Sequence, residues 1–145
     1  MRFFREFFDI MRWFLSSLLI LWSGCFLLFG AEIELTVVAT ADLHGQLAIL
    51  DGPVTDAVRE AEKRNPGGVL YVDAGDAAQG TFAVWRTRGA GAPAMLHRAG
   101  CAVWVPGNHE LEFGFESFKA LVREFPGAVL AANLNAPELA DKVEP

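Results

Sequence analysis

Apolar residues are gathered in four short runs along the body of the chain, and turn-forming or polar residues follow each run. The first two runs are rich in β-branched residues and show no alternation with polar ones, which predicts strands that are buried on both faces. The third and fourth runs also predict strands. The four predicted strands cover residues 33–40, 69–73, 101–105 and 128–134.

Segments with the helical spacing of apolar residues lie between these runs. Pro53 suits the first turn of a helix, and Asp51 is a candidate cap for it. Residues 82–91 show no clear pattern. Strands that alternate with helices predict βαβ units with right-handed crossovers and a parallel sheet, so the expected fold class is α/β. The predicted helices cover residues 53–64, 92–99 and 116–125.

The N-terminal segment has the features of an export signal. Three arginines precede an apolar run over residues 13–29, and this basic flank is expected to stay in the cytoplasm while the rest crosses the membrane. A cleaved signal peptide, an uncleaved membrane anchor and a lipid attached at Cys25 all fit the pattern. We therefore expect a signal or anchor over residues 1–31 and a periplasmic or extracellular domain over residues 32–145.

Composition narrows the classes of function. The 145 residues allow one domain or part of a larger one. The net charge of −6 does not suit binding to a nucleic-acid polymer, whereas clustered carboxylates attract divalent cations. Residues 32–145 hold one cysteine, Cys101, so we expect no disulfide framework and a buried packing role for this thiol.

The first three predicted strands each end in polar residues. Each cluster alone also fits a hydrogen-bonded structural histidine or a simple turn. Because the carboxyl ends of neighbouring parallel strands meet at one edge of a sheet, the three clusters together predict a single site. The residues are Asp42 and His44 after the first strand, Asp76 after the second, and Asn108 and His109 after the third.

The residue types in these clusters suit a metal site. Oxygen and imidazole ligands without a thiolate favour Zn, Mn or Fe, and two such cations about 3.5–4 Å apart can activate water and hold a phosphoryl group. Asp76 follows the middle strand and has two oxygens, so it is the candidate bridge. Asn108 can give its amide oxygen to a metal, which turns His109 toward the substrate, where it can stabilise the transition state or protonate the leaving group. Glu112 can hold that imidazole in the required tautomer.

Three ordered motifs also carry a resemblance to a known family. They are Asp42-Leu43-His44, Gly75-Asp76-Ala77-Ala78-Gln79-Gly80-Thr81 and Gly107-Asn108-His109-Glu110. Over residues 35–133 the chain resembles the calcineurin-like metallophosphoesterases, and in particular their exported 5′-nucleotidase branch. The resemblance implies two divalent metal ions. It makes Asp42 and His44 ligands of one ion, Asp76 the bridge, Asn108 a ligand of the second ion, and His109 the catalytic histidine.

The same resemblance implies an architecture and a substrate. The expected fold is the N-terminal half of a four-layer αββα sandwich, with mostly parallel strands and crossover helices, preceded by the hydrophobic N-terminal segment. The expected reaction is hydrolysis of a small phosphate ester or a nucleotide by a two-metal mechanism, as in 5′-nucleotidases and 2′,3′-cyclic-nucleotide phosphodiesterases. The membrane is a further partner if the N-terminal segment stays uncleaved.

Two features depart from the family pattern. The branch usually has Asp where this chain has Glu112. No histidine follows His109, although the family takes further metal ligands from later histidines, so the second ion would keep only Asp76 and Asn108. Half of a sandwich would also leave one sheet with exposed apolar surface. These points favour the N-terminal part of a truncated enzyme. The alternative is an inactive membrane-anchored remnant, or a subunit that needs another chain to complete the site.

The remaining conspicuous side chains are expected to be structural. Trp85, Trp104 and the phenylalanines between residues 113 and 125 are expected in the core, and His97 is expected at the surface or in packing. A Rossmann-like small-molecule binder is disfavoured because no Gly-x-Gly-x-x-Gly loop follows the first predicted strand.

Overall fold

The computed structural model describes residues 32–145. The predicted signal peptide or anchor over residues 1–31 lies outside this range. Within the described range, none of the helices has both the length and the apolar character that crossing a membrane requires.

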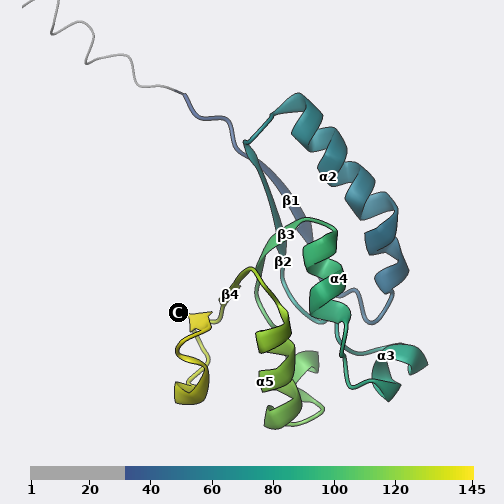
Figure 1. Ribbon diagram of the computed structural model, residues 1–145, viewed down its shortest axis with the longest axis vertical. Coiled ribbons are helices and arrows are strands. Elements are labelled where there is room, and N and C mark those ends of the chain that lie inside the picture. Colours follow the sequence, from purple (N-terminus) through teal and green to yellow (C-terminus); the bar gives the residue numbers. More distant parts are fainter. Residues whose placement is uncertain (1–31) are drawn as a thin grey trace, which may run out of the picture. The chain divides into compact units, whose positions relative to one another are not determined.

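A five-stranded parallel sheet forms the centre of residues 34–145, with its strands in chain order (Figure 1). This confirms the predicted α/β class. The fourth strand ends at Leu130 rather than at residue 134. A short fifth strand, which was not predicted, lies beside it, and the Ala131 N–H donates to the Glu144 carbonyl at 2.8 Å. The strands are β1 (Thr36–Thr40), β2 (Val69–Asp73), β3 (Cys101–Trp104), β4 (Ala128–Leu130) and β5 (Val143–Glu144).

Four α-helices lie in the three connections from β1 to β4, as the alternating pattern predicts. The helix α2 begins with Pro53 in its first turn, but its N-cap is Gly52 with no side-chain cap. The prediction of Asp51 as the cap is therefore wrong, and the Asp51 carboxylate lies 3.5 Å from the Arg98 guanidinium instead. The helices are α2 (Pro53–Arg64), α3 (Phe82–Arg86), α4 (Ala92–Arg98) and α5 (Phe115–Glu124), and the 3-10 turns are η1 (Leu47–Asp51), η2 (His109–Leu111) and η3 (Pro137–Leu139).

Only one face of the sheet is buried by helices. Tyr71, Trp104 and Val129 point to that face and join the core that the helices complete. The opposite face stays open, because Val37 is 54% exposed and none of its neighbours on that face is buried. The prediction that the first strand is buried on both faces is thus wrong. A run of β-branched residues makes both faces apolar, but the described helices cover only one.

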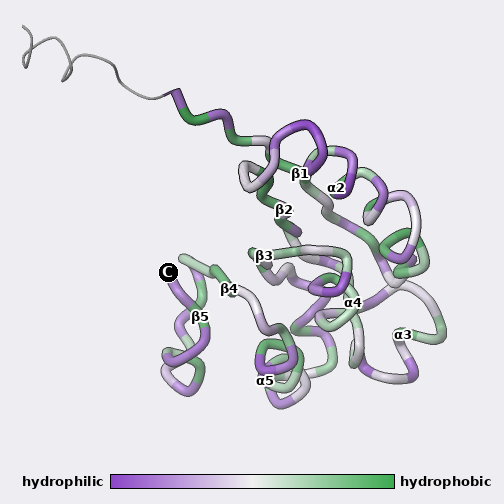
Figure 2. Tube along the Cα trace, turned by 45° about the horizontal axis from the view of Figure 1, so that its top comes forward, coloured by the Kyte–Doolittle hydropathy of each residue, from purple (hydrophilic) through white to green (hydrophobic). Residues whose placement is uncertain are grey.

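The hydropathy of the residues differs between the strands of the sheet and the helix α2. Figure 2 shows hydrophobic stretches along β1 and β2 and a largely hydrophilic course along much of α2. The open face carries small and branched apolar side chains, in agreement with the expectation that these residues build one sheet of a sandwich. The residues on it include Val37, Ala39, Leu70, Val72, Val103, Ala128 and Leu130.

Aromatic residues divide between the core and the surface. Trp104 is 1% exposed and its ring lies edge-on to Phe125 at 5.7 Å, which confirms its predicted core position. Trp85 is 57% exposed, so the prediction that it belongs to the core is wrong. It lies on α3, a helix of five residues that buries only Val84. His97 is exposed beside the Phe125 ring and Cys101 is buried, both as expected.

Candidate functional site

The loops that follow β1 and β2 are joined by backbone hydrogen bonds beyond the ends of the strands. The N–H groups of Asp42 and His44 donate to the carbonyls of Gly75 and Asp76, each at 2.9 Å, and the Gly45 N–H donates to the Ala77 carbonyl at 3.1 Å. The two loops therefore stay paired beyond the last residues of the strands. This pairing brings the polar residues of two strand ends to one place, as the parallel topology predicts.

Four of the predicted site residues meet at this edge. Ligand atoms of His44, Asp76 and His109 all lie within 4.8 Å of one another. The rings of the two histidines meet edge to face with centroids 4.8 Å apart. The Asp42 carboxylate lies 3.6 Å from Nε2 of His44. Asn108, which precedes His109, is exposed and lines a hollow of about 370 Å³ with Pro106 and Leu111 among its other walls.

The backbone is strained at three of these residues. Asp42, His44 and Asp76 have φ angles of 54°, 45° and 59°, in the left-handed region that side chains other than glycine seldom adopt. Within residues 32–145, Arg88 is the only other non-glycine residue with a positive φ. Strain of this kind persists only where the surroundings impose it, and it is concentrated at functional sites. The strain therefore supports the assignment of these three residues to one site.

Glu110 is the residue that holds the second and third loops together. Its side chain is fully buried, and one of its oxygens accepts hydrogen bonds from the N–H groups of Gly107 at 2.6 Å and Asp76 at 2.9 Å. Its other oxygen accepts from Ala77 at 2.8 Å and Ala78 at 2.9 Å. This role could not be predicted from the sequence, because a glutamate in a polar motif can equally be an exposed ligand or a buried acceptor of backbone hydrogen bonds.

Two glycines allow these loops to approach each other. A Cβ atom on Gly75 would lie 2.3 Å from the Gly107 nitrogen, and a Cβ on Gly107 would lie 2.2 Å from the Asp76 carboxylate. Only glycine fits both positions, so the carboxylate of Asp76 can rest directly against the backbone of the neighbouring loop.

His109 is fixed by its backbone and accompanied by Glu112. The His109 N–H donates to Oδ1 of Asp76 at 2.9 Å. Nδ1 of its ring lies 2.6 Å from the Glu112 carboxylate, although the two groups are not aligned as a hydrogen bond. Gln79 holds the carboxylate in place by donating to its other oxygen at 2.5 Å. Glu112 thus reaches the imidazole that it is predicted to orient.

A buried polar network lies beneath the strand ends. The Thr40 hydroxyl donates to Asp73 at 2.6 Å, and the Gly75 N–H donates to the other carboxylate oxygen at 3.0 Å. The Tyr71 hydroxyl lies 2.9 Å from that of Thr40. Burial is the main cause that raises the pKa of Asp73 to about 6, and burial likewise raises the pKa values of Tyr71 and Cys101 to about 12. This buried carboxyl was not anticipated from the sequence.

The chemistry of the donor set fits a divalent cation. Two imidazoles and a carboxylate converge, with a second carboxylate on Asp42 beside one of the rings. Such mixed nitrogen and oxygen donors suit Zn, Mn or Fe. The buried Nδ1 of His109 without an aligned partner is a further sign that the imidazole serves something other than packing.

Two solved structures of nucleotidases are similar to this chain. The 5′-nucleotidase precursor from Thermus thermophilus matches with 28% identity and a TM-score of 0.63, over 77% of this chain and 25% of that one. The NAD nucleotidase of Haemophilus influenzae matches with 24% identity and a TM-score of 0.65, over 77% of this chain and 23% of that one. At that identity the second match shows the fold alone. The chain thus spans about a quarter of the length of these structures.

Sequence comparison gives the family. No curated protein matches the chain significantly. The family model for calcineurin-like phosphoesterases matches residues 35–143, which is well over half of the chain and includes every predicted site residue. The chain therefore belongs to the calcineurin-like phosphoesterase family.

Proposed function

We propose that this chain provides one half of the active site of an exported, metal-dependent phosphoesterase that hydrolyses nucleotides or other small phosphate esters. The observation that carries the proposal is the meeting of His44, Asp76 and His109 within 4.8 Å at the carboxyl edge of the sheet. The similarity to a 5′-nucleotidase precursor supports the class of substrate. The apolar N-terminal run supports export.

The strand-end residues have separate parts in this proposal. Asp42, His44 and Asp76 would hold one divalent cation, and Asp76 together with Asn108 would hold a second. Zn, Mn or Fe suits these donors. A cation bound there supplies Lewis-acid polarisation of the phosphoryl group.

His109 gives a proton to the leaving oxygen of the ester. With Nδ1 of its ring beside Glu112, Nε2 is the nitrogen left for the substrate. Gln79 keeps Glu112 at this distance and so keeps the ring turned. The competing role for His109 is that of a direct metal ligand, because a nitrogen of its ring lies within 4.8 Å of the ligand atoms of both Asp76 and His44.

The second half of the site is proposed to come from another segment or another chain. Asp76 and Asn108 alone are too few protein ligands for a second cation of this type. The open apolar face of the sheet favours such a completing partner, since monomers seldom expose extended apolar surface. The same observation favours the second candidate function, a subunit or membrane-anchored remnant without activity of its own.

Metal binding and hydrolysis by the full chain test the proposal together. Calorimetric titration with Mn²⁺ or Zn²⁺ should show saturable binding that Asp76→Asn and His44→Asn weaken at least ten-fold. Asp56→Asn, an exposed carboxylate on α2, is the matched control and should change nothing. His109→Asn should leave cation affinity nearly unchanged if this histidine serves the substrate, and should weaken it like His44→Asn if it is a ligand.

The activity assay separates the two candidate functions. We expect no hydrolysis of AMP or bis-p-nitrophenyl phosphate by the full chain alone. Hydrolysis that needs the cation and is lost in Asp76→Asn would show a complete site and would refute the half-site proposal. A chain that binds neither Mn²⁺ nor Zn²⁺ would refute the metal-dependent function altogether.

A further inference from the structure

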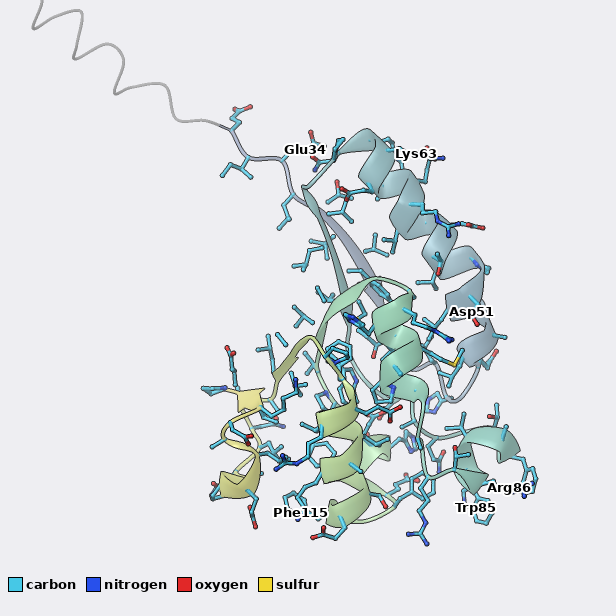
Figure 3. The ribbon with its side chains drawn as sticks, viewed as in Figure 1. Glu34, Asp51, Lys63, Trp85, Arg86 and Phe115 are labelled. Atoms are coloured by element: carbon cyan, nitrogen blue, oxygen red, sulfur yellow. The ribbon has the colours of Figure 1, made fainter. Side chains whose placement is uncertain are left out.

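Two large aromatic side chains lie exposed on α3. Phe82 is 74% exposed and Trp85 is 57% exposed, and their rings lie nearly parallel, with centroids 6.2 Å apart and an angle of 21° between the planes. Figure 3 shows Trp85 projecting outward from α3 together with Arg86. Neither ring fills the core, since Val84 is the residue that anchors this helix.

The rings form the apolar wall of an open hollow of about 400 Å³. The rest of the wall is polar or is bare backbone. The hollow is thus a shallow, open depression in which an aromatic wall adjoins polar groups. The lining residues are Gln79, Gly80, Thr81, Phe82 and Trp85.

The floor of the hollow lies directly against the metal-site residues. A Cβ on Gly80 would lie 2.2 Å from the His44 carbonyl and 2.7 Å from the His44 side chain, so the two backbones are in close contact. Gln79 donates to Glu112, which in turn lies beside His109. The hollow is therefore next to the place where a phosphate would bind.

Thr81 fixes the aromatic wall in this position. Its hydroxyl donates to the Gly45 carbonyl at 3.3 Å, and its oxygen caps α3 by accepting from the Val84 N–H at 3.4 Å. The Trp85 N–H donates to the Thr81 carbonyl at 2.8 Å. The backbone of α3, which carries the two rings, is thus tied to the loop that carries His44.

We propose that this hollow binds the planar ring of the phosphate ester, a nucleobase or an aryl group, while the phosphate lies at His44 and Asp76. The inference rests on the proposed function for the identity of the neighbouring site. Aromatic rings exposed as a fixed pair offer a π-face that accepts any flat ring by stacking. Gln79 and Thr81 add polar atoms that can contact the ring edge or the sugar, so Phe82 and Trp85 determine specificity and take no part in the chemistry.

Binding of matched ligands to the full chain tests the proposal. With Zn²⁺ present, AMP should bind more tightly than ribose 5-phosphate, which lacks the base, by about ten-fold, the usual size of a stacking contribution. Phe82→Ala and Trp85→Ala should each remove most of this advantage and leave the affinity for ribose 5-phosphate unchanged. Phenyl phosphate in place of AMP shows whether any flat ring suffices or a nucleobase is needed.

Phe115→Ala supplies the matched control, because Phe115 is a partly exposed aromatic residue on α5 and does not line the hollow. It should preserve the ten-fold preference for AMP. The hollow proposal is overturned if AMP and ribose 5-phosphate bind equally well, or if Phe115→Ala acts like Trp85→Ala.

Adenosine separates this inference from the proposed function. It has no phosphate, so it should bind weakly with or without Zn²⁺, lose binding in Trp85→Ala and keep it in Asp76→Asn. If ribose 5-phosphate fails to bind the Zn²⁺-loaded chain, the proposed function fails while the adenosine result still decides the hollow. Unchanged adenosine binding in Trp85→Ala, together with a loss of self-association in sedimentation, would assign the rings to contact between chains and overturn the proposal.

Discussion

Replacing Glu110 by glutamine keeps the size of the side chain and removes its charge. The carboxylate is fully buried and each of its oxygens accepts two backbone hydrogen bonds, from Gly107 and Asp76 on one side and from Ala77 and Ala78 on the other. An amide has one accepting oxygen. Whichever way it turns, its NH₂ group faces two N–H donors that then have no acceptor.

The expected loss of stability follows from the two hydrogen bonds that Glu110→Gln removes. A hydrogen bond to a charged group contributes about 1.5–3 kcal/mol, and a buried donor without an acceptor incurs its desolvation cost in addition. Two such losses amount to roughly 3–6 kcal/mol in the free energy of unfolding, and relaxation of the loops keeps the expected effect of Glu110→Gln at the lower end. Because small domains are stable by only about 5–15 kcal/mol, the variant should be folded but markedly weakened.

Urea denaturation of the full chain in EDTA, followed by circular dichroism, measures this change. Glu116→Gln makes the same chemical change at a side chain that is 86% exposed and paired with Lys119, and it should cost less than about 1 kcal/mol. A loss below about 1 kcal/mol in Glu110→Gln would refute the reasoning, since it would mean that the four hydrogen bonds do not hold the loops.

Three further predictions concern residues around the same edge. Burial raises the pKa of Asp73 from 3.8 to about 6. The contribution of this group to the free energy of unfolding is therefore full below pH 3.8 and is lost as the pH rises through about 6, a decline of roughly 3 kcal/mol. Urea titrations from pH 4 to pH 7 should show this decline in the wild-type chain and a flatter profile in Asp73→Asn. Gly75→Ala should lower the melting temperature by several degrees, because its Cβ would meet the backbone of Gly107 at 2.3 Å, whereas Gly52→Ala, with open space around it, should lower it far less. Zn²⁺ at a hundred times its dissociation constant should stabilise the wild-type chain by about 2.7 kcal/mol in thermal melts. Because Asp76→Asn should weaken Zn²⁺ binding at least ten-fold, its gain at the same Zn²⁺ concentration should be about 1.4 kcal/mol or less.

The order of strands and helices could be predicted because it depends on local signals. Runs of apolar residues and glycine-rich turns mark β2 and β3, and the helical spacing of apolar residues marks α2 and α5, with bounds within a residue of those observed. The strand at the edge of the sheet could not be predicted, because β5 has only two residues and forms through its pairing with β4. Burial also could not be predicted for the first strand, because an apolar run does not tell how many faces other elements cover.

The sequence shows which residues can bind a metal, but it does not show the backbone geometry that brings them together. Metal ligands are a short list of residue types at strand ends, so Asp42, His44 and Asp76 stand out in the sequence. Their left-handed backbone does not, since it is imposed by hydrogen bonds from a neighbouring loop. The carboxylate of Glu110 supplies part of that constraint by binding the Asp76 N–H from a position 34 residues away. The strained backbone at Asp76 therefore depends on the buried carboxylate of Glu110. The cation affinity of Asp76 should fall when Glu110 is changed, even though Glu110 touches no cation.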